Sequence, residues 1–356
     1  MKSPYISELQ PNQTVHGTFL VSYKEIRQKK GGDPYLSVTL SDRTGDLDAR
    51  MFDNASEFLD AFERDDFVRV KGLLQVFQNR PQLTLHRIQS ISDSEVDASD
   101  YFPVSKRDRD EMFRELQSWI AGMANPHLKA LLDAVFADES IAVPFRSAPA
   151  AKTVHHNWIG GLIEHVLSMC NLAKFTAGHY PNIDFDLLLA GVILHDVGKI
   201  RELSYTRSIA YTTEGQLLGH IMIGIGIIEV KLRQVPDFPA RLHELLLHMI
   251  LSHHGELEFG SPKVPLFPEA LLLHFIDNLD SKMECMRSLI EKDRSVTGEW
   301  TAYSSALERS ALKKSKFLEP KERSAKPGIP TPPTPKNEPS SPFAAKLMSA
   351  LQRETN

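Results

Sequence analysis

The spacing of hydrophobic and polar positions changes along the chain. Between residues 13 and 92 the two classes alternate, as in TVHGTFLVSYKEIRQ and FVRVKGLLQVFQ, and the turn-forming stretches GGDP, DRTGD and QNRPQ separate these runs. Period-two alternation between turns is typical of half-buried strands. The pattern predicts about five strands, with one short helix over ASEFLDAFERDD between the third and the fourth. This order is the layout of an OB-fold barrel.

A helical periodicity follows the polar stretch SDSEVDASDYFPVSKRD. Apolar positions then recur at intervals of three and four, as Met112, Leu116 and Ile120 do, which indicates amphipathic helices. We therefore expect a multidomain α+β protein. Its predicted parts are an all-β OB-fold barrel that binds nucleic acid (10–95), a linker (96–106) and an all-α region (107–315).

The last part of the chain, 316–356, is rich in proline and serine, as in EPKERSAKPGIPTPPTPKNEPSSP. This composition predicts a disordered or polyproline-like segment. It ends in FAAKLMSALQRE, where Phe343, Leu347 and Leu351 can form one face of a short helix. Two interpretations stay open here, a weakly structured tail and a docking helix for a partner.

Composition narrows the class of protein only moderately. The length of 356 residues suggests two domains, and 42% hydrophobic and 24% charged residues are ordinary for a globular protein. The net charge of −5 argues weakly against a nucleic-acid binder, because a local basic groove can lie on an acidic protein. Both cysteines, Cys170 and Cys285, lie in apolar helical patterns. We expect them to be reduced core residues.

The sequence gives no indication of a signal peptide or of a membrane span. Its first residues, MKSPYISELQPNQ, lack the apolar core of a signal peptide. We find no apolar run close to the roughly 18–20 residues that a membrane span needs. The expected location is the cytoplasm.

Histidines cluster in the helical region. Eleven of the fourteen lie between His155 and His274. The notable positions, each in or at the end of a strongly apolar helical pattern, are His165, His195-Asp196, His220, His253-His254 and Asp277. An unpaired polar side chain in such surroundings costs several kcal/mol, which metal ligation would remove. Imidazoles and carboxylates without thiolates suit Mn²⁺, Fe²⁺, Co²⁺, Ni²⁺ or Zn²⁺, and a helical bundle can bring ligands from separate helices to one point.

This order of ligand types, H…HD…H…HH…D, resembles that of the HD-domain metal-dependent phosphohydrolases over roughly residues 150–290. The sequence HDVGK, residues 195–199, looks like the version found in their phosphodiesterase and nuclease branches. Together with the OB-like region and the phrase HHNWIGGLIEHV, the chain is similar to the YhaM-type 3′–5′ exoribonucleases over about residues 10–315.

The resemblance implies a site, a reaction and partners. One ion would be held by His165, His195, Asp196 and Asp277, and a second by Asp196 as a bridge with His220, His253 and His254. Asp280 is the rival of Asp277. The two ions, preferably Mn²⁺, would activate a water that attacks a phosphodiester in line. The substrate would be single-stranded RNA, or also single-stranded DNA, digested from its 3′ end, and a homo-oligomer is plausible.

For several neighbouring residues, the sequence allows both a functional and a purely structural interpretation. Lys199 would give a positive charge to the phosphate, with Gly198 freeing the backbone to turn it toward the substrate; otherwise it is a solvated lysine after a helix C-terminus. His155 and His156 would bind phosphate or support the ligands, or else form a polar helix entrance. Glu164 would orient a ligand or pack at the bundle surface.

Nucleic-acid contacts in an OB barrel come from stacking aromatics and basic side chains. The candidates are Lys24, Lys29, Lys30, Tyr35, Arg50 and Phe52. Alternating aromatics in a small barrel are more often core residues, and their faces depend on register. The loop RQKKGGDPY is expected to expose its lysines.

Three functions fit the sequence. The leading hypothesis is a metal-dependent exonuclease that acts on single-stranded RNA. The second is a phosphohydrolase of the same chemistry for small nucleotides or cyclic dinucleotides, with the barrel as a regulatory module. The third is a nucleic-acid-binding protein whose HD domain is inactive.

Overall fold

The computed structural model describes residues 2–29, 31–53, 57–77, 80–152, 156–293 and 298–319. The chain divides into two compact units, Met1–Ala311 and Leu312–Asn356. The first contains a β-barrel and a helical bundle, and the described part of the second contains one short helix, α10 (Lys314–Leu318). The predicted α+β class is confirmed.

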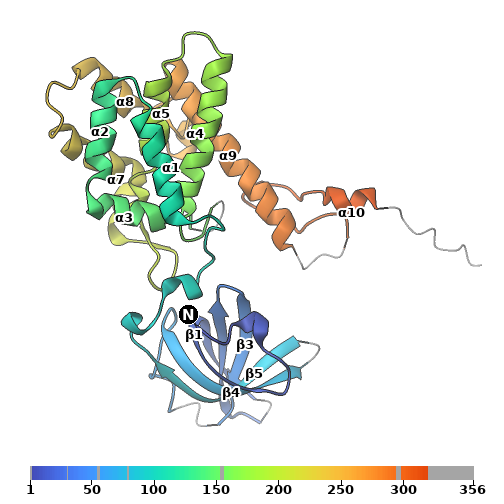
Figure 1. Ribbon diagram of the computed structural model, residues 1–356. Coiled ribbons are helices and arrows are strands. Elements are labelled where there is room, and N and C mark those ends of the chain that lie inside the picture. The colour runs from blue at the N-terminus through green and yellow to red at the C-terminus, as the bar shows by residue number, and fades with distance from the viewer. Residues whose placement is uncertain are drawn as a thin grey trace, which may run out of the picture. The chain divides into compact units, whose positions relative to one another are not determined.

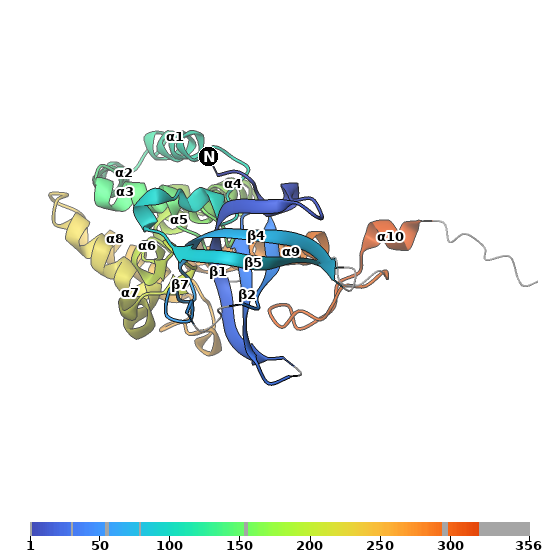
Figure 2. The same ribbon diagram turned by 90° about the horizontal axis from the view of Figure 1, so that it is seen from below.

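The N-terminal region forms the expected barrel of five strands (Figures 1 and 2). Its strands are β1 (Thr14–Gln28), β2 (Pro34–Asp42), β3 (Gly45–Met51), β4 (Phe67–Phe77) and β5 (Arg80–Ser90). They close in the order β1-β2-β3-β5-β4, with β3 and β5 parallel and the other described pairs antiparallel. Alternation along β1 puts Val15 and Phe19 into the barrel core, where both are fully buried. Phe19 is therefore a core residue of the barrel.

The helix expected over ASEFLDAFERDD is wrong for the residues that the structure describes. Residues 57–60 and 64–65 form turns, and the rest of this segment up to residue 66 has no helix or strand. The Lys24 ammonium on β1 donates hydrogen bonds to the carbonyls of Leu59 and Phe62, and Phe62 is buried in the barrel core. A buried aromatic anchor and a lysine that satisfies the carbonyls replace helical hydrogen bonding in this segment.

Part of the predicted linker is buried, although its sequence is polar. Two short 3-10 turns, Asp93–Glu95 and Ala98–Asp100, follow β5. Tyr101 and Phe102 are buried, and the Tyr101 hydroxyl donates to Thr18 Oγ1 on β1 at 2.7 Å. This part of the segment packs on the barrel and is not a free linker.

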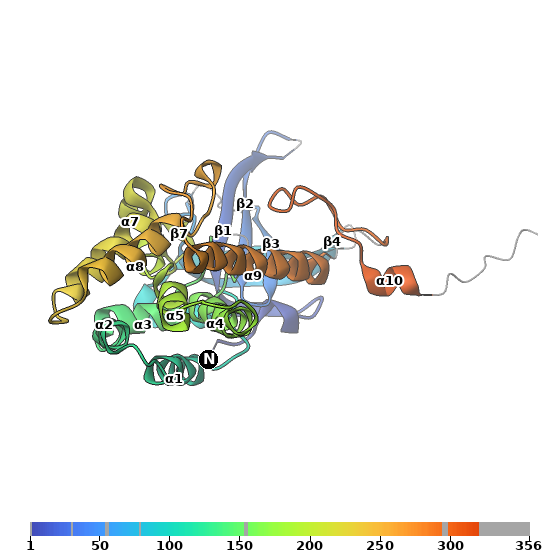
Figure 3. The same ribbon diagram turned by 90° about the horizontal axis from the view of Figure 1, so that it is seen from above.

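The bundle contains nine helices among the described residues, and Figure 3 shows α9 alongside α4 and α5. Side-chain caps begin several of them: Asp184 accepts a hydrogen bond from the amide of Leu187 at the start of α5. The helices are α1 (Arg109–Ala121), α2 (Pro126–Phe136), α3 (Glu139–Ser147), α4 (Gly161–His179), α5 (Phe185–Leu194), α6 (Lys199–Glu202), α7 (Thr213–Leu232), α8 (Ala240–Ser252) and α9 (Pro268–Lys292). The region is not entirely helical, because Leu203–Ser204 and Ala210–Tyr211 pair as two short strands, β6 and β7.

Helix α7 contradicts the expectation that no apolar run approaches the length of a membrane span. By length and composition alone it is apolar enough to cross a membrane, with a mean hydropathy of 1.4 over its best window. Within the bundle, however, Ile223, Ile227 and Ile228 of α7 are buried in the main hydrophobic core. Gly219 breaks the helix with φ of 69° and ψ of 160°. One face of this kinked helix therefore belongs to the core of the bundle.

The disorder predicted from residue 316 onward is contradicted at its start, because α10 continues to Leu318. The rest of the proline-rich segment, with the predicted helix face of Phe343, Leu347 and Leu351, lies outside the described residues.

Candidate metal centre

Five helices bring the predicted ligand residues to one place. His165 lies on α4, His195 and Asp196 follow α5, His220 lies on α7, His253 and His254 follow α8, and Asp277 lies on α9. Four of these side chains are almost inaccessible: His165 and His195 are 0% exposed, His253 1% and Asp196 2%. The site is thus built inside the hydrophobic core of the bundle.

Asp196 lies between two groups of imidazoles. Its Oδ2 is 3.2 Å from His195 Nε2 and 4.0 Å from His165 Nε2. Its Oδ1 is 3.5 Å from His220 Nε2 and 3.9 Å from His253 Nε2. Each oxygen of this carboxylate therefore faces one group of imidazoles. A ligand that bridges two ions requires this arrangement.

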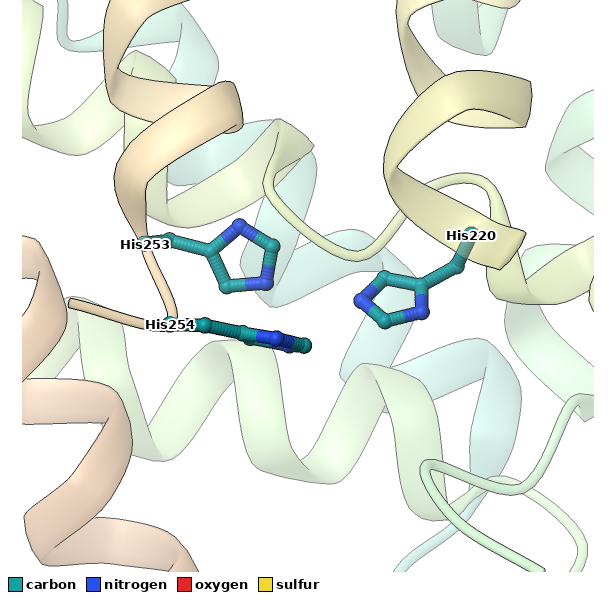
Figure 4. Close-up of side chains that lie close together, drawn as sticks. All are labelled: His220, His253 and His254. Carbon is teal, nitrogen blue, oxygen red and sulfur yellow. The ribbon is translucent and has the colours of Figure 1, made fainter. Parts of the chain in front are cut away.

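Two groups of candidate ligand atoms lie close enough together to hold a metal ion each. Ligand atoms of His165, His195 and Asp277 lie within 4.8 Å of one another, and so do those of His220, His253 and His254. Figure 4 shows the rings of His253 and His254 side by side, with the His220 ring opposite them. A cation in either set would be surrounded by borderline donors of the kind that first-row divalent metals prefer.

The backbone fixes the orientation of two of these rings. His195 Nδ1 lies 2.8 Å from the carbonyl of Val192, and His253 Nδ1 lies 2.7 Å from the carbonyl of Ile250. Because a carbonyl only accepts, Nδ1 carries the proton and Nε2 keeps its lone pair. Each lone pair is consequently directed toward Asp196 and the centre of the site.

The carboxylates of Glu202 and Asp280 fix the rings of His220 and His165. His220 Nδ1 lies 3.0 Å from Glu202 Oε1, which also accepts from the His220 amide at 2.9 Å. His165 Nδ1 lies 2.7 Å from Asp280 Oδ2. A carboxylate behind a ligating histidine orients the ring and raises its basicity. All four central histidines thus have an acceptor at Nδ1.

The same geometry separates Asp277 from its rival Asp280. Asp277 Oδ1 lies 3.3 Å from His165 Nε2, on the side of the ring that faces the centre. Asp280 lies at the opposite nitrogen, where its carboxylate also meets His156 Nε2 at 3.1 Å and accepts from the Ser168 hydroxyl. The geometry favours Asp277 as the ligand and Asp280 as the residue that orients His165.

The electrostatics of the described residues fit a bound cation. Among them, His220 Nε2, His253 Nε2 and Asp196 Oδ1 are buried without a hydrogen bond. Burial lowers the pKa of His253 well below its usual value, which keeps the ring neutral and able to bind a metal. Burial alone would raise the pKa of Asp196, but the neighbouring positive charge, chiefly that of Lys199, outweighs it and holds that pKa well below its usual range. Leaving buried nitrogen and oxygen lone pairs without a partner is costly in free energy, and a bound cation would remove that cost.

Lys199 contacts the central carboxylate, whereas Gly198 plays a different part from the one expected. Lys199 Nζ lies 2.6 Å from Asp196 Oδ2, and its side chain is 12% exposed. Its positive charge therefore meets the central carboxylate directly. Gly198 has an ordinary helical φ of −64°, so it does not free the backbone. A Cβ at this position would lie 2.0 Å from the carbonyl oxygen of His220, and Gly198 thus permits close contact between α6 and α7.

The residues around His156 form a support and not a separate entrance. His156 is buried, and its ring packs against Trp158 with centroids 5.0 Å apart. Trp158 Nε1 in turn donates to Glu164 at 2.8 Å. Glu164 therefore holds the tryptophan that packs on His156, and reaches the site only through these contacts. His155 lies outside the described residues.

The barrel candidates divide into two kinds. Tyr35 and Phe52 pack together with ring centroids 5.5 Å apart, Arg50 lies 5.7 Å over Tyr35, and Lys29 lies 5.5 Å over Phe52. Beside them is a cavity of about 600 Å³ that Arg50 and Phe52 line together with Phe77. Lys24 does not join this group: its ammonium is bound to the Leu59 and Phe62 carbonyls, which contradicts its predicted role. Lys30 lies outside the described residues.

The sequence reasoning missed Glu202 and Ser168. Glu202 lies on the short helix α6, one turn after Lys199, and its carboxylate reaches His220 because the backbone breaks at Gly219. A break inside an apolar helical pattern leaves no clear sequence signal. Ser168 had a signal, since it follows His165 by three positions and shares its helix face.

Comparison with known proteins agrees with this geometry. Residues 162–282 match the HD domain, and residues 23–91 match the OB-fold nucleic acid binding domain. The chain is 38% identical over 287 residues to the 3′-5′ exoribonuclease YhaM of Bacillus subtilis (strain 168), which covers 80% of this chain and 90% of that protein. The chain belongs to the YhaM family. The YhaM proteins of Bacillus velezensis (37% over 300 residues, 84% of this chain and 94% of that protein) and Geobacillus sp. (38% over 287 residues, 80% and 87%) are similarly related.

Among solved structures, the second OB-fold domain of replication protein A from Methanococcus maripaludis is 22% identical, covering 25% of this chain and 94% of that domain with a TM-score of 0.22. The HD domain of YhaM-family members implies dependence on divalent metal, as the resemblance in sequence predicted.

Proposed function

We propose that this protein is a metal-dependent 3′–5′ exoribonuclease, the activity in the name of its relatives. The observation that carries the proposal is the position of Asp196, whose two oxygens face two separate groups of imidazoles. A cytoplasmic location and single-stranded RNA as the main substrate are part of this proposal.

The proposed ligand set has two halves. One ion would be held by His165, His195, Asp196 and Asp277, and the second by Asp196 with His220, His253 and His254. The donor set supports Mn²⁺, and also Fe²⁺, Co²⁺, Ni²⁺ or Zn²⁺. Divalent ions in such a site supply Lewis acidity, which polarises the phosphodiester and lowers the pKa of water.

The protein's own residues position and protect this chemistry. The Nδ1 hydrogen bonds of the four histidines orient every Nε2 atom toward the centre. Lys199 offsets the negative charge on Asp196 Oδ2, and its ammonium would also pair with a phosphate oxygen of the substrate. In the reaction, a water oxygen bonds to phosphorus as the bond to the 3′ oxygen of the preceding nucleotide breaks. That oxygen takes a proton, and the terminal nucleotide leaves with a 5′-phosphate.

The barrel would bind the single strand. Tyr35 and Phe52 offer ring faces for stacking, and Arg50 and Lys29 add positive charge next to them. Stacking of bases on such rings contributes about 1–3 kcal/mol per base and tolerates any sequence. This cluster is the proposed nucleic-acid contact of the OB fold.

The deciding experiment uses metal-stripped full-length protein and a 5′-labelled single-stranded RNA, with and without Mn²⁺. We expect a ladder that shortens from the 3′ end only when Mn²⁺ is present and Asp196 is intact. The test variant is Asp196→Ala, and the control is Asp133→Ala, which changes an exposed aspartate on α2. Intact RNA under every divalent ion would refute the proposal. Turnover of mononucleotides or cyclic dinucleotides instead would establish the small-nucleotide hydrolase, and RNA binding without turnover of either would establish the inactive binding protein.

A further inference from the structure

A cavity of about 320 Å³ adjoins the metal centre. The proposed ligands His253, His254 and Asp277 form one part of its wall. The other part comes from α9, with His274, Asn278, Ser281 and Lys282. This volume lies near the lower end of the usual range for ligand pockets, about 300–1,000 Å³, and suits a group the size of a single nucleotide.

The wall on α9 is fixed relative to the centre. Ser281 follows Asp277 by four positions and lies one turn further along the same side of α9, and Lys282 follows Asn278 by four positions along the adjacent side. The Ser281 hydroxyl also donates to Asp277 Oδ1 at 3.2 Å. A group bound against this wall therefore has a defined distance from whatever the ligands hold.

The floor of the cavity is also well determined. His274 is buried, and its Nδ1 lies 3.0 Å from the carbonyl of His253. Its ring packs directly on Gly255, where a Cβ would lie 2.3 Å from two ring atoms. Gly255 thus leaves room for the imidazole, with φ of 79° in the left-handed region that favours glycine.

The chemistry of the wall favours a phosphorylated sugar. Lys282 is exposed at the rim and makes no ion pair within the described residues, in contrast to Lys199. Asn278 offers an amide and Ser281 a hydroxyl, both of which suit sugar hydroxyls. The one carboxylate in the lining, Asp277, faces His165 Nε2. An ammonium, an amide and a hydroxyl beside a metal centre match the parts of a nucleoside monophosphate.

We propose that this cavity holds the 3′-terminal nucleotide of the substrate and then the released nucleoside 5′-monophosphate. Lys282 pairs with a phosphate oxygen, and Asn278 binds a hydroxyl of the terminal ribose. Asn278 and Lys282 are therefore specificity-determining residues, while Ser281 positions Asp277. This inference rests on the proposed function, and it goes further by assigning the substrate's end to residues of α9 outside the ligand set.

The test measures binding of adenosine 5′-monophosphate to the full-length, Mn²⁺-loaded protein by calorimetry. We expect Lys282→Ala to weaken binding about tenfold, since a charge-assisted hydrogen bond to phosphate is lost, and Lys282→Arg to restore most of it. The KM for RNA should rise by a similar factor with little change in kcat. The matched control is Lys174→Ala, which removes an exposed lysine from a separate cavity beside Trp119.

A second variant tests the sugar contact. Asn278→Ala should reduce the preference for adenosine 5′-monophosphate over its 2′,3′-dideoxy analogue, while inorganic phosphate binds the variant and the wild type equally. If Lys282→Ala binds adenosine 5′-monophosphate as tightly as the Lys174→Ala control, or if wild-type protein binds inorganic phosphate as tightly as the nucleotide, the proposal is overturned. Lys282-dependent nucleotide binding in a protein that digests no RNA would uphold the cavity and reject the exonuclease, so the two failures are distinguishable.

Discussion

The metal centre and the barrel surface use polar side chains in opposite ways. At the centre, His165, His195, His220 and His253 are each held by a partner at Nδ1. On the barrel, the rings of Tyr35 and Phe52 are half-buried and rest on each other, with Arg50 and Lys29 alongside. The centre is preorganised and intolerant of change, whereas the barrel offers an adaptable surface. The difference suits one site that does chemistry at a fixed point and another that accepts many sequences.

The largest effect is expected from the residue that serves both halves of the centre. Asp196→Asn keeps the size of the side chain but removes the charge that would bridge two ions. We expect RNA hydrolysis to fall by at least about 10³-fold, because loss of metal activation removes the main source of catalysis. Single-turnover assays with the 5′-labelled RNA measure it. Retention of more than a tenth of the activity would contradict the bridging role.

Close packing around the centre gives the next largest effect. Gly198→Ala places a Cβ 2.0 Å from the His220 carbonyl oxygen, so α6 and α7 must separate. We expect the free energy of unfolding to fall by about 3 kcal/mol, at the upper end for overpacking. Urea unfolding measures the loss. Gly178→Ala on α4 is the matched control, since a Cβ there meets nothing within 4 Å, and an equal effect of both substitutions would refute the packing argument.

The two supporting carboxylates should each affect one half of the centre. Asp280→Asn disturbs His165, and Glu202→Gln disturbs His220, without removing a ligand. We expect a loss of about 10–100-fold in Mn²⁺ affinity, in the first half for Asp280→Asn and in the second for Glu202→Gln. Calorimetric Mn²⁺ titration of the stripped variants resolves the two halves. A combined loss in both halves from either variant alone would show that the halves are not independent.

The barrel surface should give the smallest effect. Phe52→Ala removes one stacking ring, and we expect the KM for a long RNA to rise about tenfold, within the range for a lost base contact. The kcat should not change, because the centre is untouched. Steady-state kinetics on RNAs of different length measure this, and Leu266→Ala, at an exposed apolar position far along the chain, serves as control. A fall in kcat on short RNA would reject the separation of binding surface from centre.

Prediction from sequence was most accurate where chemistry and hydrophobicity conflict. His195 and Asp196 stand out because imidazole and carboxylate are costly at the end of an apolar helix, and the structure brings both to the centre with the other ligand candidates. The strands of the barrel were also predicted correctly, because hydrophobic and polar positions alternate along much of their length. The helix expected over ASEFLDAFERDD failed, since local propensity yielded to the anchor of Phe62 and the hydrogen bonds of Lys24.

The sequence by itself determined the kinds of element, the class of ligands and the family to which the chain belongs, because these depend on local periodicity and on residue types in a fixed order. Only the tertiary structure decided which side of His165 belongs to Asp277 and which to Asp280. It likewise revealed Glu202 behind His220, the packing role of Gly198 and the loss of Lys24 from the binding face. These are questions of distance and direction between segments far apart in the chain, and a pattern along one dimension does not contain them.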